Sequence, residues 1–229
     1  MRQVVFIFAL CLLVVSAYAG TYVETFDDGD FDGWEILEGL GAVGQSEWKV
    51  VDGVATCRNG SVYGSMPFFG EDDWRNYTIE CDAKIVEPIV NLHNTSLGLR
   101  MLWRNSSDFN YIWCLPSPPW GAALIWAWFN GEGSGQSARK PFKQEISRWY
   151  RLKGVAHEDS FELYIDGELM ASMSDSRFPT GRVGLQANGC LANFDNVVIT
   201  GDDVPDNANL AAVSASGKLA TIWGHLRSK

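Results

Sequence analysis

Apolar and polar residues alternate along much of the chain with a period of two. The clearest run is 77–85, in which every odd position is apolar and every even position is polar. This period predicts a half-buried strand whose odd positions face the core. Segments 161–165 and 169–171 are also rich in apolar residues, and the Asp166-Gly167 pair between them predicts a tight hairpin turn.

Further strands are predicted at similar spacing. Their ranges are 48–57, 96–104, 109–115, 122–129, 149–156, 182–187 and 194–200. About ten strands without helical segments between them indicate antiparallel pairing, because parallel pairs need helical crossovers. So many strands overfill one open sheet. The predicted fold class is therefore all-β, a two-sheet antiparallel jelly-roll β-sandwich, with a lipocalin-type barrel as the alternative.

The two ends of the chain differ from this pattern. An apolar run follows Arg2 and leads to Ala17-Tyr18-Ala19, which predicts a secretory signal helix over 1–19 that is cleaved before Gly20. We therefore expect a secreted or extracytoplasmic protein. The jelly-roll domain is expected over 20–201, and a polar linker with a short C-terminal tail over 202–229. No second apolar run is long enough to predict a membrane span.

Composition narrows the classes of partner. The chain has 229 residues, a formal net charge of −10 and 46% hydrophobic residues. An acidic surface repels a phosphate backbone, so nucleic acid is not an expected partner, and the apolar content argues against disorder. Four cysteines follow the signal segment without a CxxC motif, and both two disulfides and buried thiols fit this pattern. They are Cys57, Cys81, Cys114 and Cys190.

A series of short motifs runs through residues 22–200. The motifs are Phe26–Trp34, Trp48–Gly53, Trp103-Arg104, Asp108–Tyr111, Trp149–Leu152, Tyr164–Glu168 and Phe194–Ile199. In this order and at these separations, the set resembles the concanavalin A-like lectin/glucanase superfamily. Within it, laminin G-like (LamG-like) jelly rolls and bacterial 3-keto-disaccharide hydrolase domains are the most similar. The resemblance implies a sandwich with adjacent first and last strands, whose concave sheet faces a carbohydrate.

The resemblance does not identify catalytic residues. The Glu-x-Asp-x-(x)-Glu run of laminarinase-like members is missing, and its nearest approach is Glu80-Cys81-Asp82. Glu80 and Asp82 share one face of a strand at a spacing of about 7 Å, which suits a glycosidase pair. However, their face lies opposite the predicted core side, where we expect them to be solvated. The catalytic residues therefore stay unassigned.

Tryptophan is concentrated in one part of the chain. Five of the ten tryptophans fall in a short stretch, namely Trp103, Trp113, Trp120, Trp126 and Trp128. Trp126 and Trp128 are two residues apart, so they project from one face of their strand, while Ala123, Ile125, Ala127 and Phe129 cover the other face. Two interpretations fit: the loop 116–120 buries these rings, or the rings form a platform for a sugar.

Polar side chains complete the candidate binding site. Arg100 and Arg104 are expected on one face of strand 96–104, opposite the apolar residues at 99, 101 and 103. There they would donate hydrogen bonds to sugar hydroxyls or a uronic carboxylate, or form ion pairs within the sheet. Gln186, together with Asn188, adds amide groups. The predicted carbohydrate-binding residues are Arg100, Arg104, Trp126, Trp128 and Gln186.

An acidic cluster near the N-terminus suggests calcium. Four aspartates lie between Asp27 and Asp32, and oxygen ligands suit Ca²⁺. Many sandwich lectins hold a structural Ca²⁺ where the first and last strands meet. The resemblance therefore implies a site with Asp27 and Asp195 as metal ligands. The alternative is a set of solvated turn residues. No organic cofactor is expected.

These observations favour a secreted, monomeric, lectin-like module that binds an oligo- or polysaccharide without catalysis. One alternative is a glycoside-acting hydrolase of the 3-keto-disaccharide hydrolase type. Another is an adhesion or protein-interaction domain whose tryptophans all belong to the core.

Overall fold

The computed structural model describes residues 19–37, 46–61, 65–105 and 108–207. The predicted signal segment up to residue 18 and most of the predicted tail lie outside the described residues. The described chain forms β-strands and one 3₁₀ turn, η1 (Pro118–Trp120), without an α-helix, and no helix in it could cross a membrane. The strands are β1 (Gly20–Glu24), β2 (Glu35–Leu37), β3 (Ser46–Val51), β4 (Val54–Asn59), β5 (Met66–Phe69), β6 (Tyr77–Pro88), β7 (Asn94–Asn105), β8 (Asp108–Ser117), β9 (Ala122–Phe129), β10 (Glu132–Gln136), β11 (Lys140–Pro141), β12 (Tyr150–His157), β13 (Ser160–Ile165), β14 (Glu168–Ser174), β15 (Arg182–Asn188) and β16 (Cys190–Gly201).

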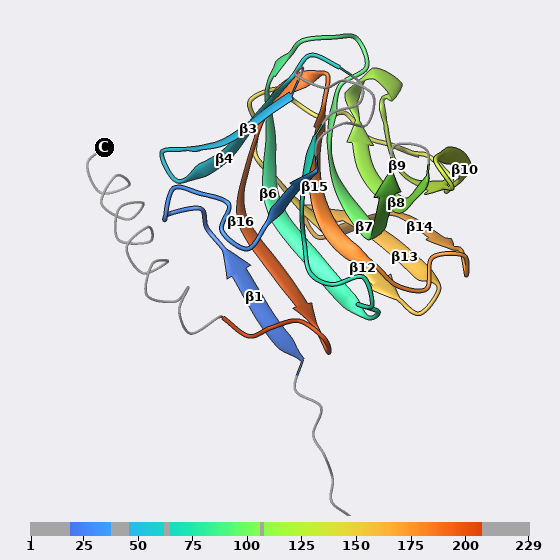
Figure 1. The fold of residues 1–229 in the computed structure, drawn as a ribbon. Helices are drawn as coiled ribbons and strands as arrows, with labels where there is room; N and C mark the ends of the chain where they lie inside the picture. Colours follow the sequence, from blue (N-terminus) through green and yellow to red (C-terminus); the bar gives the residue numbers. More distant parts are fainter. Residues whose placement is uncertain (1–18, 38–45, 62–64, 106–107, 208–229) are drawn as a thin grey trace, which may run out of the picture.

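The strands form two packed sheets of eight strands each (Figure 1). Sheet A has the order β14-β13-β12-β6-β16-β4-β3, with β1 beside β16. Sheet B has the order β10-β9-β8-β7-β15-β5-β2, with β11 beside β9. Neighbouring strands are antiparallel, which confirms the predicted two-sheet sandwich. The first and last strands are paired, as the resemblance implied.

The core lies between the two sheets and follows the period of two. In β6 the odd-numbered residues from Ile79 to Ile85 are 0% exposed. They belong to one cluster with inward residues of sheet B, such as Leu97 and Ile125. Burying a side chain of this size contributes about 1.5–3 kcal/mol to stability. The hydrophobic effect on alternate positions therefore accounts for the sandwich.

The segment predicted as one strand over 48–57 is a hairpin. Asp52 and Gly53 adopt positive φ angles of 52° and 70°, and they connect β3 to β4. Two consecutive residues with positive φ form the turn whose twist matches that of the paired strands. The prediction of a single strand was wrong, because the apolar residues on both sides of this Asp-Gly pair were assigned to one strand although the pair forms a turn.

A bulge in β7 changes which side chains face outward. Arg100 has a positive φ of 53°, and the register against β8 shifts after Leu99. An extra residue in a bulge reverses the alternation of the strand beyond it. As a result, Leu99 packs between the sheets, whereas Met101 and Trp103 belong to a cluster on the outer face of sheet B. The prediction that these three side chains share one face was wrong.

The four cysteines are buried and form no disulfide within the described chain. Their thiols therefore match the buried-thiol alternative of the two that the sequence left open. Burial raises the pKa of Cys190 to about 12, and it raises the pKa of Cys57, Cys81 and Cys114 as well.

Candidate functional site

The outer face of sheet B is apolar, although it points away from the core. The inner face of sheet B is apolar as well, because it packs against sheet A. Sheet B therefore has apolar side chains on both of its faces, which is unusual for an antiparallel sheet beside solvent. The outer side chains come mainly from β5, β7, β8 and β9, and we call them the aromatic face. They are Met66, Phe68, Met101, Phe109, Tyr111, Trp113, Leu115 and Leu124, which are buried, and Leu37, Trp103, Trp120, Trp126 and Trp128, which are half-buried.

The rings on this face form a continuous row. The Phe109 ring lies 5.4 Å from that of Trp103 and 6.1 Å from that of Trp128. Trp126 in turn lies 6.1 Å from Trp128 and 5.6 Å from Trp120. These are distances at which aromatic pairs attract each other. The row positions flat indole surfaces along the sheet before any ligand arrives.

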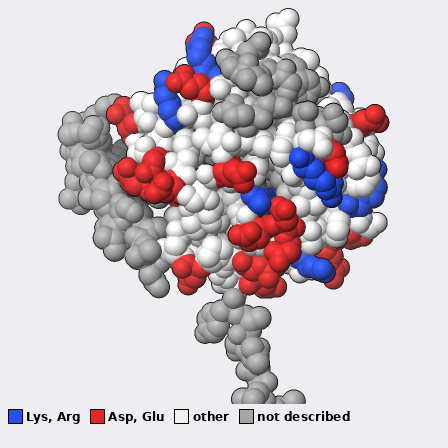
Figure 2. Space-filling model, viewed as in Figure 1, with Lys and Arg blue, Asp and Glu red and all other residues white. Residues whose placement is uncertain are grey.

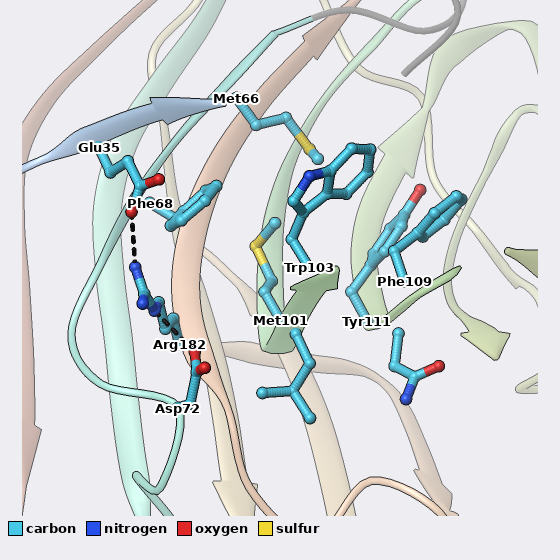
Figure 3. Close-up of a pocket in the computed structure, with 11 residues that line it drawn as sticks. Glu35, Met66, Phe68, Asp72, Met101, Trp103, Phe109, Tyr111 and Arg182 are labelled. Atoms are coloured by element: carbon cyan, nitrogen blue, oxygen red, sulfur yellow. Dashed lines mark hydrogen bonds and ion pairs between the residues drawn. The ribbon is translucent and has the colours of Figure 1, made fainter. Parts of the chain in front are cut away.

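One end of the row borders a hollow at the edge of the sheet, which we call the edge hollow (Figure 3). Arg182 donates hydrogen bonds to Glu35 and Asp72, each at 2.8 Å, and its guanidinium lies 5.3 Å from the centre of the Phe68 ring. The three charged side chains, with Phe68 beside Arg182, thus form one side of the hollow, and the side chains of the other aromatic residues and the methionines form the other. The lining residues are Glu35, Met66, Phe68, Asp72, Met101, Leu102, Trp103, Phe109, Asn110, Tyr111 and Arg182.

A second hollow, which we call the tryptophan hollow, lies at the other end of the row, where Trp128, Trp126 and Trp120 line it. Its cavity volume is about 140 Å³. Indole rings form its apolar walls, and neutral polar side chains complete it. The lining residues are Leu92, His93, Asn94, Trp113, Leu115, Ser117, Trp120, Trp126, Trp128 and Asn188.

Two buried amides lie on this side of sheet B. Gln186 and Asn188 are each 1% exposed, and they pair in register with Ser96 and Asn94 of β7. Asn188 donates to Asn94 Oδ1 at 3.1 Å, but its own Oδ1 has no hydrogen-bond partner. Neither amide atom of Gln186 has one. A buried polar group without a partner costs about 1–3 kcal/mol, so a ligand that formed hydrogen bonds with these amides would remove that cost. Asn188 lines the tryptophan hollow, whereas Gln186 lines neither hollow.

His93 also lines the tryptophan hollow. Its Nδ1 lies 3.0 Å from the carbonyl oxygen of Val90. A carbonyl oxygen only accepts, so Nδ1 carries the proton and Nε2 carries the free lone pair in the neutral ring. The sequence did not single out His93, because a lone histidine in a loop has no recognisable spacing to other reactive groups.

The structure separates the two predicted arginines from the aromatic face. Arg100 is 0% exposed, and it donates to the carbonyl oxygens of Pro179 and, at 3.0 Å, of Glu158. Burial lowers its pKa. Arg104 is exposed and forms an ion pair of 2.9 Å with Asp108. Neither arginine lines either of the two hollows.

The other predicted binding residues lie together. Trp126 and Trp128 of β9 line the tryptophan hollow, and Gln186 lies on the outward side of β15, which β8 and β7 separate from β9. The predicted division of β9 is confirmed, because Ala123, Ile125 and Ala127 pack in the core between the sheets. The structure therefore places Trp126, Trp128 and Gln186 on one surface.

Glu80 and Asp82 lie on the outer face of sheet A, as the alternation predicted. Arg151 bridges them with contacts of 3.3 Å to each carboxylate. Asn196 donates a further hydrogen bond of 2.9 Å to Asp82, and Lys153 lies 3.3 Å from Glu80. Ion pairs and amide contacts thus occupy these two carboxylates.

The predicted calcium ligands engage nearby groups. Asp27 accepts a hydrogen bond of 3.0 Å from Thr25 Oγ1, and Asp195 accepts one of 2.7 Å from the backbone of Asn196. In the described ranges, the structure contains no group of three or more His, Cys, Asp or Glu side chains that could hold a metal ion. A calcium ion takes six to eight oxygens, and the structure adds no observation in favour of such a site. Calcium binding by Asp27 and Asp195 therefore stays a prediction.

Comparison with known proteins identifies the family. Residues 21–200 match the model of the 3-keto-alpha-glucoside-1,2-lyase-like domain, and the chain belongs to this family. The resemblance predicted from the sequence is thereby confirmed. Comparison with curated proteins gave no match.

Solved structures share the fold. Carbohydrate-binding module CBM66 from Bacillus subtilis has a TM-score of 0.59 and 21% identity, over 72% of this chain and 93% of the module. Bacillus licheniformis beta-glucanase has a TM-score of 0.58 and 12% identity, over 80% and 98%. A Bacillus subtilis protein with a galectin-like fold has a TM-score of 0.59 and 11% identity, over 80% and 96%. At these identities the similarity establishes the shared jelly-roll fold.

Proposed function

We propose that the protein is a secreted, lectin-like module that binds a carbohydrate on the aromatic face of sheet B, as a single chain and without catalysis. The row of indole rings beside the buried amides of Gln186 and Asn188 is the observation that carries this proposal. Indole faces pack well against the C–H faces of sugar rings. The amides supply both donors and acceptors, which is what sugar hydroxyls require.

Two further findings support this proposal. The family is named for a glucoside, and a carbohydrate-binding module shares the fold. In addition, the glycosidase-like carboxylate pair Glu80 and Asp82 is engaged in ion pairs on the other sheet, away from the aromatic face. Binding needs only a platform and hydrogen-bonding groups, and the aromatic face offers both.

Affinity electrophoresis against a panel of polysaccharides tests the proposal. We expect at least one polysaccharide to retard the protein, and we expect Trp126→Ala to weaken this retention about tenfold or more, as for a hot-spot contact. Trp149→Ala is the matched control. Trp149 is 39% exposed, immediately precedes β12 of sheet A and contacts Lys84, so its removal should leave retention unchanged. Absence of retardation on every polysaccharide, or equal loss in both variants, would contradict the proposal.

The family match also favours a second candidate function, cleavage of a 3-keto-α-glucoside. A 1,2-elimination removes the C2 proton, which the neighbouring ketone acidifies, forms a C1–C2 double bond and expels the C1 substituent with its bonding electrons. The step needs a base near C2. His93 Nε2 is the candidate base, because its lone pair is free and the ring lines the tryptophan hollow.

Release of the C1 substituent from a chromogenic 3-keto-α-glucoside tests this candidate. Under it, His93→Gln abolishes release but retains binding, whereas His157→Gln, an exposed residue at the end of β12, changes neither. If the wild-type protein binds glycans but releases no C1 substituent, the lyase function is rejected and the binding function stands.

A further inference from the structure

Given the proposed function, we propose that the carbohydrate is a neutral glycan and that Glu35 and Asp72 select against glycans bearing carboxylate or sulfate groups. This inference deepens the proposed function by naming the class of ligand. It follows from the charges and hydrogen-bonding groups around the two hollows.

The edge hollow carries an excess of negative charge. Among its lining residues only Glu35, Asp72 and Arg182 are charged, so two carboxylates accompany one guanidinium. Both carboxylates bind Arg182, whose side chain is 25% exposed, while theirs are 63% and 65% exposed. An approaching anion therefore meets the carboxylates before the guanidinium, and like charges brought together oppose binding.

The tryptophan hollow carries no Lys, Arg, Asp or Glu among its lining residues. Its polar groups are amides, a hydroxyl and His93. A sugar hydroxyl can donate to Asn188 Oδ1, whereas a carboxylate or sulfate only accepts and would face that oxygen unfavourably. The same holds for Gln186 Oε1 on the same strand, β15. Hydroxyls, which both donate and accept, therefore suit both amides, whereas an anionic group can accept from Gln186 Nε2 but cannot donate to either amide oxygen.

Cations near the aromatic face do not reverse this preference. The structure buries Arg100 and pairs Arg104 with Asp108, so neither offers a guanidinium to an anionic sugar. Arg139 stacks on Trp120 at 4.8 Å. It is exposed, lies at the end of the ring row away from Trp103 and the edge hollow, and does not line either hollow. Elsewhere on the molecule, groups of acidic side chains add to the negative field (Figure 2).

Matched derivatives of one polysaccharide test the inference. A neutral polysaccharide that retards the protein is compared with its carboxymethyl and hydroxyethyl derivatives at equal substitution, so that charge is separated from size. We expect the carboxymethyl form to bind about tenfold more weakly than the hydroxyethyl form at low ionic strength, where screening is small.

Two double variants locate the effect. Glu35→Gln with Asp72→Asn releases Arg182 from its counterions, and we expect the difference between the two derivatives to shrink about tenfold. Glu47→Gln with Glu87→Gln changes the net charge equally, but on the exposed parts of sheet A, and should keep the difference. Melting temperatures and far-UV circular dichroism confirm that both double variants fold.

The outcomes are distinct. Equal binding of the carboxymethyl and hydroxyethyl forms by the wild-type protein overturns the inference while the proposed function stands. An equal change in both double variants overturns the assignment to Glu35 and Asp72 in favour of long-range charge. Binding of anionic polysaccharides alone likewise overturns the inference, whereas failure of every polysaccharide, neutral or anionic, to bind overturns the proposed function itself and is seen before the derivatives are compared.

Discussion

At the residue scale, several polar groups are buried, and they differ in whether the fold supplies hydrogen-bond partners for them. Gln186 and Asn188 hold amide atoms without partners, and Glu24 of β1 is only 8% exposed. For the amides near the aromatic face, the proposed binding of a ligand would account for this cost. Glu24 differs, because it accepts hydrogen bonds from the backbone of Phe26 at 2.7 Å and from Tyr22 at 3.1 Å.

The buried Glu24 carboxyl leads to a pH prediction. Burial raises the pKa of Glu24 above its ordinary value of 4.5, and its hydrogen bonds offset this only in part. The folded state therefore holds this proton more tightly than the unfolded state. Its contribution to stability is complete below about pH 4.5 and is lost as the pH rises through the raised pKa. Glu24→Gln should thus gain stability relative to the wild type as pH rises, which melting temperatures at a series of pH values would show. A difference independent of pH would contradict this account.

At the element scale, turns and bulges decide which residues reach which surface. The β7 bulge at Arg100 turns Met101 and Trp103 onto the aromatic face, and the Asp52-Gly53 turn folds one expected strand into the β3–β4 hairpin. In both places a positive φ angle breaks the period of two. Alternation along a sequence predicts sides correctly only until such a residue occurs.

Gly53 offers a direct test of the hairpin turn. Its φ of 70° strains any residue with a Cβ, so Gly53→Ala should lower the free energy of unfolding by about 1 kcal/mol. Gly60→Ala is the control, because Gly60 lacks a positive φ and a Cβ there would meet no atom within 4 Å. Denaturant unfolding measures both variants. Equal effects would show that the turn does not require glycine.

At the scale of the whole molecule, the two sheets have different outer faces. The outer face of sheet A carries a network of charged groups around Arg151, whereas the outer face of sheet B is the aromatic face. The inner faces of both sheets bury a common core that includes the four cysteines. The proposed binding surface therefore lies on sheet B, and the cysteines contribute to packing.

Thiol titration tests the packing of the whole sandwich. Burial raises the pKa of Cys190 to about 12 and holds the thiols away from solvent, so they should react slowly or not at all with a thiol reagent in the native protein. In denaturant all four should react. Fewer than four reactive thiols in the denatured, unreduced protein without its predicted signal segment, which holds Cys11, would show that disulfides form instead.

Some of these features are determined by the sequence alone. The alternation in 77–85 and 122–129 places Ile79, Ala83 and Ile125 in the core and Trp126 and Trp128 outside it, because a strand turns successive side chains to opposite faces. The ordered motifs likewise identify the family. Local period and order along the chain are enough for these conclusions.

Only the tertiary structure decided which groups meet on the aromatic face. Glu35, Asp72 and Arg182 come from three separate segments and converge through the pairing of β2, β5 and β15, while His93 reaches the tryptophan hollow from a loop. A bulge in β7, where its register against β8 shifts, removes Arg100 from that face. Strand order and register depend on contacts between residues far apart in the chain. The alternation of apolar and polar residues is a local pattern and does not predict these contacts.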